Sequence, residues 1–221
     1  MRVRILIAVA AALVVALGAK YLFFPGPARE ENADQARQKT EQLVRAKDID
    51  GLRKEVQGSD EYTAKVAVSA LGELGAPART AVEHALADRR PAVREKAATS
   101  FAKVATSEQA GKLVDLLRKD ESPDVRAAAV ASLDRMFAFR EMDAIIDAME
   151  DPDPAVRRRA SKAAIKFSGV TVQYNPDASL EECRKGAKRM REYWEANKLN
   201  TIRLLNSYYE SHYRQAPADN E

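Results

Sequence analysis

Basic side chains recur at one position of a repeating segment, and they are the residues with the clearest chemical pattern. They are Lys103, Arg135 and Lys166, each ten residues after a valine, with Arg158, Arg159 and Lys162 shortly before the last of them. A column of cations could bind the carboxylates of an acidic protein segment or anionic lipid headgroups. The same pattern also occurs on helix faces that contact only solvent. Nucleic acid is disfavoured, because exposed aromatic residues do not alternate with the cations and the net charge is only +3.

Reactive side chains are scarce in this sequence. The chain of 221 residues has one cysteine, Cys183, and two histidines, His84 and His212. These numbers exclude an internal disulfide framework, a Cys-rich metal site and a histidine cluster. We interpret His84 as a surface residue and Cys183, which lies on an apolar helical stripe, as a buried thiol. The sequence has no Gly-rich phosphate loop or Ser/His/Asp set, so we expect no catalysis, no cofactor and no metal.

Three acid–base pairs share a spacing of six residues. They are Asp88 with Arg94, Asp120 with Arg126, and Asp151 with Arg157. A carboxylate near a helix start accepts backbone N–H bonds, and an arginine can reach a neighbouring turn. We therefore predict that each pair fixes the next repeat in place; a ligand-binding ladder is the alternative. Ala64 occupies the arginine position of the first repeat, which predicts a less regular unit there.

A recurring unit of 30 to 32 residues positions these side chains. Each unit contains two apolar stripes with helical spacing, which predicts a pair of helices. The pairs are expected at 52–57 with 61–74, 79–87 with 91–104, 108–119 with 123–137, and 141–150 with 154–167. Stacked helix pairs bury apolar faces that one pair cannot bury alone. Residues 48–168 therefore predict an all-α solenoid of about four helix pairs.

A helical cap is expected after the repeats, in residues 169–214. The segment begins as a loop, and Ser179 with the glutamate three residues later forms a capping box at the start of a helix. A second capping helix is expected closer to the C-terminus, and residues 215–221 are predicted to be disordered. Trp194 falls on the apolar stripe of the first capping helix and should close the last repeat. The alternative is that Trp194 and Tyr193 mark a docking surface.

The N-terminal residues 1–27 have a different composition from the rest. Two arginines precede an apolar run, and Val3–Phe24 is long enough to span a bilayer if Lys20 extends toward the interface. We predict a single-pass anchor in a bacterial inner membrane, with the bulk of the chain on the extracytoplasmic side. A cleaved signal, giving a secreted or periplasmic protein, is the alternative. Residues 28–47 are expected to form a linker and then an N-terminal helix from Ala33.

The register Asp-x-x-Pro-x-Val-Arg resembles that of the HEAT repeat family, and more narrowly its short bilin-lyase-like form. It is carried by Asp88, Pro91, Val93 and Arg94, and it recurs at 120–126 and 151–157. The resemblance implies an α-solenoid with a binding groove. The family includes scaffolds, adaptors, lyases and a di-iron hydroxylase. The hydroxylase needs His-Glu pairs as metal ligands, and this sequence contains none.

These observations favour a non-catalytic scaffold or adaptor of the kind found among bacterial membrane-anchored HEAT-repeat proteins. It would bind an acidic protein partner through the groove of the repeats, and it would contact the membrane through residues 3–24. The alternative is an accessory protein of a bilin-lyase-like enzyme or of a chromophore system.

Overall fold

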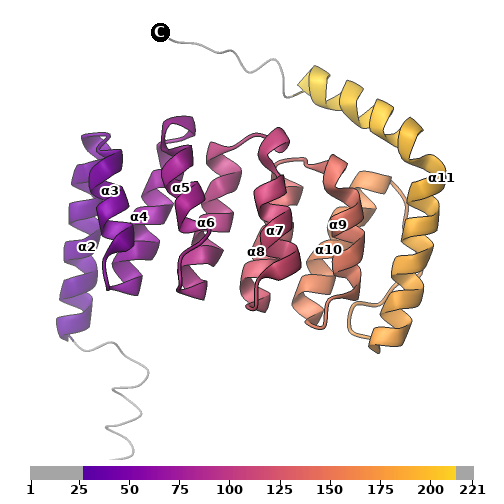
Figure 1. Cartoon of the computed structure of the whole chain (residues 1–221), viewed down its shortest axis with the longest axis horizontal. Helices are drawn as coiled ribbons and strands as arrows, with labels where there is room; N and C mark the ends of the chain where they lie inside the picture. The colour runs from indigo at the N-terminus through magenta and orange to yellow at the C-terminus, as the bar shows by residue number, and fades with distance from the viewer. Residues whose placement is uncertain (1–26, 213–221) are drawn as a thin grey trace, which may run out of the picture.

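The computed structural model describes residues 27–212, which form α-helices and short 3-10 helices without a strand in that range. The helices stand in one row from α2 to α11 (Figure 1). Neighbouring pairs in this row pack directly on one another. The architecture confirms the prediction of an all-α solenoid.

Each repeat consists of a first helix and a second helix, which we call the A helix and the B helix. The A helices are α3 (Ile49–Gln57), α5 (Arg79–Ala85), α7 (Gly111–Lys119) and α9 (Met142–Asp147). The B helices are α4 (Glu61–Glu73), α6 (Pro91–Val104), α8 (Pro123–Arg135) and α10 (Pro154–Ser168). The short helices are η1 (Ala76–Ala78), η2 (Ser107–Gln109), η3 (Phe139–Glu141) and η4 (Ala148–Glu150). Four predicted helix pairs are therefore present, with boundaries shifted by a few residues.

The B helices begin where the sequence supplies a residue suited to a helix start. A proline begins α6, α8 and α10, where its missing N–H costs no helical hydrogen bond. In α10 the side chain of Asp153 also accepts a hydrogen bond of 2.7 Å from the N–H of Ala155. These local signals explain why the sequence analysis located the B helices well.

The core of the solenoid runs between the B helices, which pack side by side in the order α4, α6, α8, α10. On α6 the residues Val93, Ala97 and Phe101 are at most 1% exposed. Leu133, which is equivalent to Phe101, is fully buried on α8. The predicted apolar stripe of the B helices is therefore the face that joins one repeat to the next.

Gly72 has a different role from the helix stop that its position near the end of α4 would suggest. It lies inside α4 and is buried. A Cβ atom at this residue would lie 2.9 Å from the Cβ of Ser100 on α6, closer than side-chain atoms normally approach. Gly72 therefore permits the close approach of α4 and α6, while Gly75, with φ of 71°, makes the turn.

The N-terminal end of the solenoid is covered by α2 (Pro27–Arg45), which packs on α4 and α3. The helix begins at Pro27, whereas the sequence analysis expected a linker up to residue 32. A proline suits the first turn of a helix, because its missing N–H costs no helical hydrogen bond there. Ala36 and Thr40 are the buried residues of α2.

The C-terminal end is covered by α11 (Leu180–His212), a single helix of 33 residues. The prediction of separate capping helices is wrong, because no glycine or proline interrupts the sequence after Gly186 within this helix. Cys183, Met190 and Trp194 are at most 2% exposed. The predicted stripe therefore closes the last repeat, and the burial of Trp194 removes it from any docking surface.

Within residues 27–212, no helix is both long enough and apolar enough to cross a bilayer. The predicted anchor, Val3–Phe24, and the predicted disordered tail, 215–221, both lie outside the described residues. Both therefore stay predictions from the sequence.

Candidate functional site

The acid–base pairs of the repeats are structural links between neighbouring B helices. The guanidinium of Arg94 donates two hydrogen bonds, of 2.7 and 2.9 Å, to the carboxylate of Asp120 in the next repeat. Arg126 binds Asp151 in the same way, with two bonds of 2.8 Å. Each arginine also donates to the carbonyl of the aspartate in its own repeat, Asp88 or Asp120. For the arginines of the first two pairs, this arrangement confirms the prediction that each pair fixes the next repeat.

The carboxyl of Asp120 shows what the link does to a buried charge. Burial opposes its ionisation, but hydrogen bonds from the Arg94 guanidinium and from the Ser122 N–H outweigh burial, so its pKa lies below the usual value. The side chain is only 4% exposed. The carboxylate of each link is therefore bound by an arginine of the chain itself and is not available to a ligand.

The two ends of this series use partners that the sequence analysis did not identify. At the first repeat, where Ala64 replaces the arginine, Asp88 binds Arg90, whose guanidinium also donates to the carbonyl of Val56. At the last repeat Arg157 donates to the carbonyl of Pro176, at 2.7 Å. An arginine two residues after the aspartate is the only sequence signal that could have indicated the first exception.

The predicted basic column lies at the C-terminal ends of the B helices. Lys103, Arg135 and Lys166 all fall in the last turn, where a cation favours the negative end of the helix dipole. Lys103 forms an ion pair with Glu73 of the preceding B helix. Lys166 binds the carboxylate of Asp134 at 2.6 Å. Two of the three column residues are therefore paired with the neighbouring repeat.

The other three predicted residues lie on α10. Arg158 donates two hydrogen bonds, of 2.7 and 2.8 Å, to the carboxylate of Asp177 in the loop before α11. Arg159 and Lys162 are exposed and, like Arg135, have no hydrogen bond or ion pair with any other residue that the structure describes. The structure thus narrows the six predicted residues to three cations with no carboxylate partner in the described part of the chain.

These three cations share a surface with a strip of small side chains on α8. Arg159 and Lys162 are three residues apart, so they lie on one face of α10. The equivalent positions on α8 are Ala128 and Ala131, which are half-buried, followed by Arg135. We call this surface, formed by the outward positions of α8 and α10, the B-helix face. It combines a strip of small side chains with unpaired positive charge.

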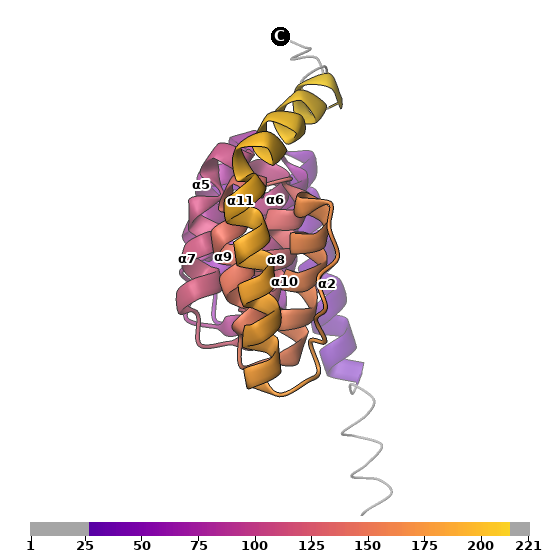
Figure 2. The ribbon, with the colours of Figure 1, turned by 90° about the vertical axis from the view of Figure 1, so that its right-hand side faces the viewer.

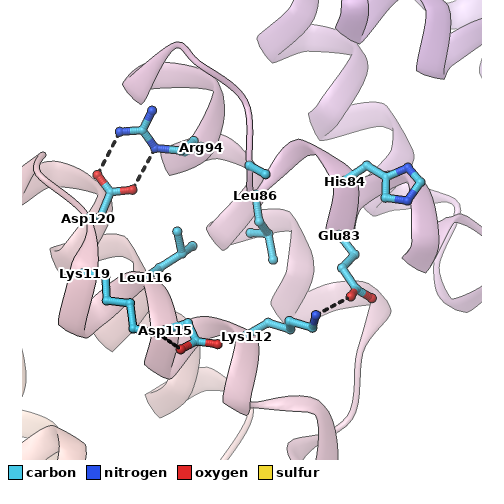
Figure 3. Close-up of a pocket in the computed structure, with 10 residues that line it drawn as sticks. Glu83, His84, Leu86, Arg94, Lys112, Asp115, Leu116, Lys119 and Asp120 are labelled. Atoms are coloured by element: carbon cyan, nitrogen blue, oxygen red, sulfur yellow. Dashed lines mark hydrogen bonds and ion pairs between the residues drawn. The ribbon is translucent and has the colours of Figure 1, made fainter.

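A cleft of about 630 Å³ lies on the opposite side of the repeats, between α5 and α7. Leu86 and Leu116 form its apolar part (Figure 3). Glu83 and Lys112 join the two helices by an ion pair of 3.0 Å across it. His84, the surface histidine of the sequence analysis, is exposed at the rim.

The charged residues of this cleft are balanced and largely satisfied within the chain. Arg94 binds Asp120, and Lys119 binds Asp115 at 2.8 Å (Figure 3). The cleft therefore offers no excess charge of either sign. The B-helix face, with three unpaired cations, is the stronger candidate for recognition of a charged partner.

Comparison with known families settles the classification. A sequence model of HEAT repeats matches residues 49–134 and again residues 112–179, which together are more than half of the chain. This chain belongs to the HEAT-repeat family. The match covers all four helix pairs and reaches the loop before α11, so residues 27–212 of the HEAT-repeat protein consist of its repeats plus a helix at each end of them.

Solved structures similar to this HEAT-repeat protein include the complex of CpcE and CpcF of phycocyanin lyase from Nostoc sp. PCC7120. The identity is 19%, the match covers 67% of this chain and 63% of that chain, and the TM-score is 0.51. A designed armadillo repeat protein matches at 18% identity over 79% and 97% of the two chains, with a TM-score of 0.45. Another, in complex with the peptide (KR)4, matches at 17% identity over 89% and 91%, with a TM-score of 0.44. At 19% identity, the match to the lyase complex shows the fold alone.

No curated protein matches the HEAT-repeat protein.

Within residues 27–212 there is no group of three or more His, Cys, Asp or Glu side chains that could hold a metal ion. The thiol of Cys183 is buried and lies 3.4 Å from the carbonyl oxygen of Asn175, which it can use as an acceptor. This position fits the structural thiol that the sequence predicted.

Proposed function

We propose that this HEAT-repeat protein is a non-catalytic scaffold that binds an acidic segment of a protein partner on the B-helix face. The observation that carries the proposal is the set of unpaired cations, Arg135, Arg159 and Lys162, beside the alanine strip of α8. Other cations of the B helices, such as Lys103 on α6 and Lys166 on α10, are neutralised by carboxylates of the chain itself. The three unpaired cations, in contrast, are available to bind carboxylates of a partner.

The alanine strip affects how close a partner can come. Small side chains at Ala128 and Ala131 let a peptide backbone approach α8, while the longer side chains of Arg159 and Lys162 rise beside it on α10. An exposed ion pair contributes roughly 0.2–1 kcal/mol. Three such pairs give selectivity and faster association more than tight binding, and both effects weaken as salt is added.

Charge reversal tests this proposal. The variant Arg135→Glu, Arg159→Glu, Lys162→Glu should keep its helical content, because all three side chains are exposed. We expect its affinity for a fluorescent glutamate-rich peptide to fall about tenfold, since three exposed pairs of about 0.5 kcal/mol each sum to about 1.5 kcal/mol. Fluorescence anisotropy at low and at physiological salt measures both the loss and its screening.

The matched control reverses three exposed cations elsewhere. The variant Arg53→Glu, Lys54→Glu, Arg89→Glu changes the net charge equally but alters the A-helix side and a loop. It should bind the peptide like the parent protein at physiological salt. Equal losses of peptide affinity in the two variants would show that binding depends on net charge alone, and would refute a site on the B-helix face. A visible absorbance band that co-purifies with the protein would argue for a chromophore accessory protein instead.

We also propose that the scaffold is tethered to a bacterial inner membrane through residues 3–24. The support is the sequence itself: Arg2 and Arg4 precede the apolar run that begins at Ile5, and Val3–Phe24 is long enough for one span. We expect the full chain to sediment with membranes and to resist extraction by salt and by carbonate. A chain truncated to begin at Gly26, just before α2, should stay in the supernatant. A mature N-terminus at Ala19 in the full-length protein would show cleavage and refute the tether.

A further inference from the structure

The C-terminal half of α11 extends beyond the last repeat and bends over the end of the row of B helices (Figures 1 and 2). Two of its contacts involve the segment just after α8. The Nη2 of Arg140 donates to the side-chain oxygen of Asn206 at 3.1 Å, and the ring of Tyr208 lies 5.9 Å from that of Phe137. This half of α11 therefore packs on η3 and on the turn that follows α8, and that turn begins directly after the cation Arg135.

Leu204 and Tyr208, on this part of α11, expose much of their side chains to solvent. Leu204 is 63% exposed and Tyr208 is 46% exposed, and they are four residues apart, so they lie on the same flank of the helix. Ile202 and Leu205, on the inward face, pack against the core. We call Leu204 and Tyr208 the α11 ledge. The contact between Tyr208 and Phe137 places the flank of the ledge toward the end of α8.

The residue that joins the ledge to the B-helix face has an unusual backbone. Phe137 has φ of 55°, a left-handed conformation that a bulky residue rarely adopts. Its ring packs edge-on against Phe139 and Phe167, and the ammonium of Lys166 lies 5.7 Å from its centroid. A strained backbone conformation of this kind persists only where the surrounding packing enforces it, and such residues are often found at functional sites. The cluster holds Tyr208 of the ledge against Phe137, which follows Arg135 by two residues in the sequence.

We propose that the acidic partner segment carries an apolar side chain among its carboxylates, and that this side chain packs on the α11 ledge while the carboxylates bind Arg135 and its neighbours on the B-helix face. This inference rests on the proposed function and adds the chemistry of the partner. Burial of one aliphatic side chain stabilises a complex more than one exposed ion pair does. The ledge should therefore contribute at least as much selectivity as any single cation of the face.

The structure offers a matched pair of variants for the test. Leu204 belongs to the ledge, while Leu199 is 80% exposed on the opposite flank of the same helix. The variants Leu204→Ser and Leu199→Ser make the same substitution at an exposed leucine of one helix, and neither should change the folding of the chain. Two fluorescent peptides serve as probes, one of glutamates with a central leucine and one with serine in place of that leucine.

We expect Leu204→Ser to weaken binding of the leucine peptide about tenfold, equivalent to about 1.4 kcal/mol, and to leave the serine peptide unchanged. Leu199→Ser should leave both affinities unchanged. The proposal for the ledge would be refuted if the two variants changed peptide affinity equally, or if Leu204→Ser weakened binding of the two peptides equally. If charge reversal on the B-helix face still weakens both peptides in that case, the scaffold proposal survives without the ledge. If charge reversal has no effect either, both proposals fail.

Discussion

The variant Leu133→Asp is expected to lose cooperative unfolding in the third and fourth helix pairs. Leu133 is fully buried on α8, which packs between α6 and α10. Removing a buried leucine side chain alone costs about 2–5 kcal/mol. A carboxylate in its place has no cation to pair with, which adds a further penalty. The sum is a large part of the roughly 5–15 kcal/mol that stabilises a typical domain.

Thermal unfolding followed by circular dichroism measures the loss, and hydrogen exchange identifies the helices that open. The control is Arg135→Asp, two residues later and exposed, which should change stability by about 1 kcal/mol or less. In a solenoid each repeat contacts mainly its neighbours, so α2 and α3 should keep more protection than α8 and α10. A variant that melts within a degree or two of the parent would show that position 133 is not in the core.

Loss of an inter-repeat link is the second large effect. The variant Arg94→Ala leaves the carboxylate of Asp120 buried without its two charged hydrogen bonds, and we expect a destabilisation of about 3 kcal/mol. The control is Arg45→Ala, which removes the exposed pair with Glu41 and should cost about 0.5 kcal/mol or less. Chemical denaturation of both variants compares the two free energies of unfolding. Equal costs would mean that the link is not buried in solution.

The pH dependence gives a sharper test of the same link. The pKa of Asp120 is lowered in the folded protein, whereas an unfolded aspartate titrates at about 3.9. The stabilisation by its ionised form is therefore fully present well above pH 4 and is lost as the pH falls through the folded-state pKa. Without Arg94, burial favours the protonated acid. The difference in stability between parent and Arg94→Ala should thus be largest near pH 7 and shrink toward pH 4. A difference independent of pH would point to lost packing of the arginine.

Short-range patterns in the sequence were sufficient to predict the repeats. Proline at a helix start and apolar residues at helical spacing act within one or two turns, so Val93, Ala97 and Phe101 could be assigned to the core. The same holds for Cys183 and Trp194 on the stripe of α11. The links between repeats also followed, because a constant register places each Arg near the next Asp.

The tertiary structure decided which charges are available to a partner. Lys103 and Arg135 occupy equivalent positions, yet Lys103 is neutralised by Glu73, 30 residues away, while Arg135 has no carboxylate partner among the described residues. The outcome depends on which side chains of consecutive B helices come into contact, and the pattern within one repeat does not encode those contacts. The same reason applies to the α11 ledge. The spacing of Leu204 and Tyr208 is visible in the sequence, but only the packing of α11 against Phe137 places them beside the cations of the B-helix face.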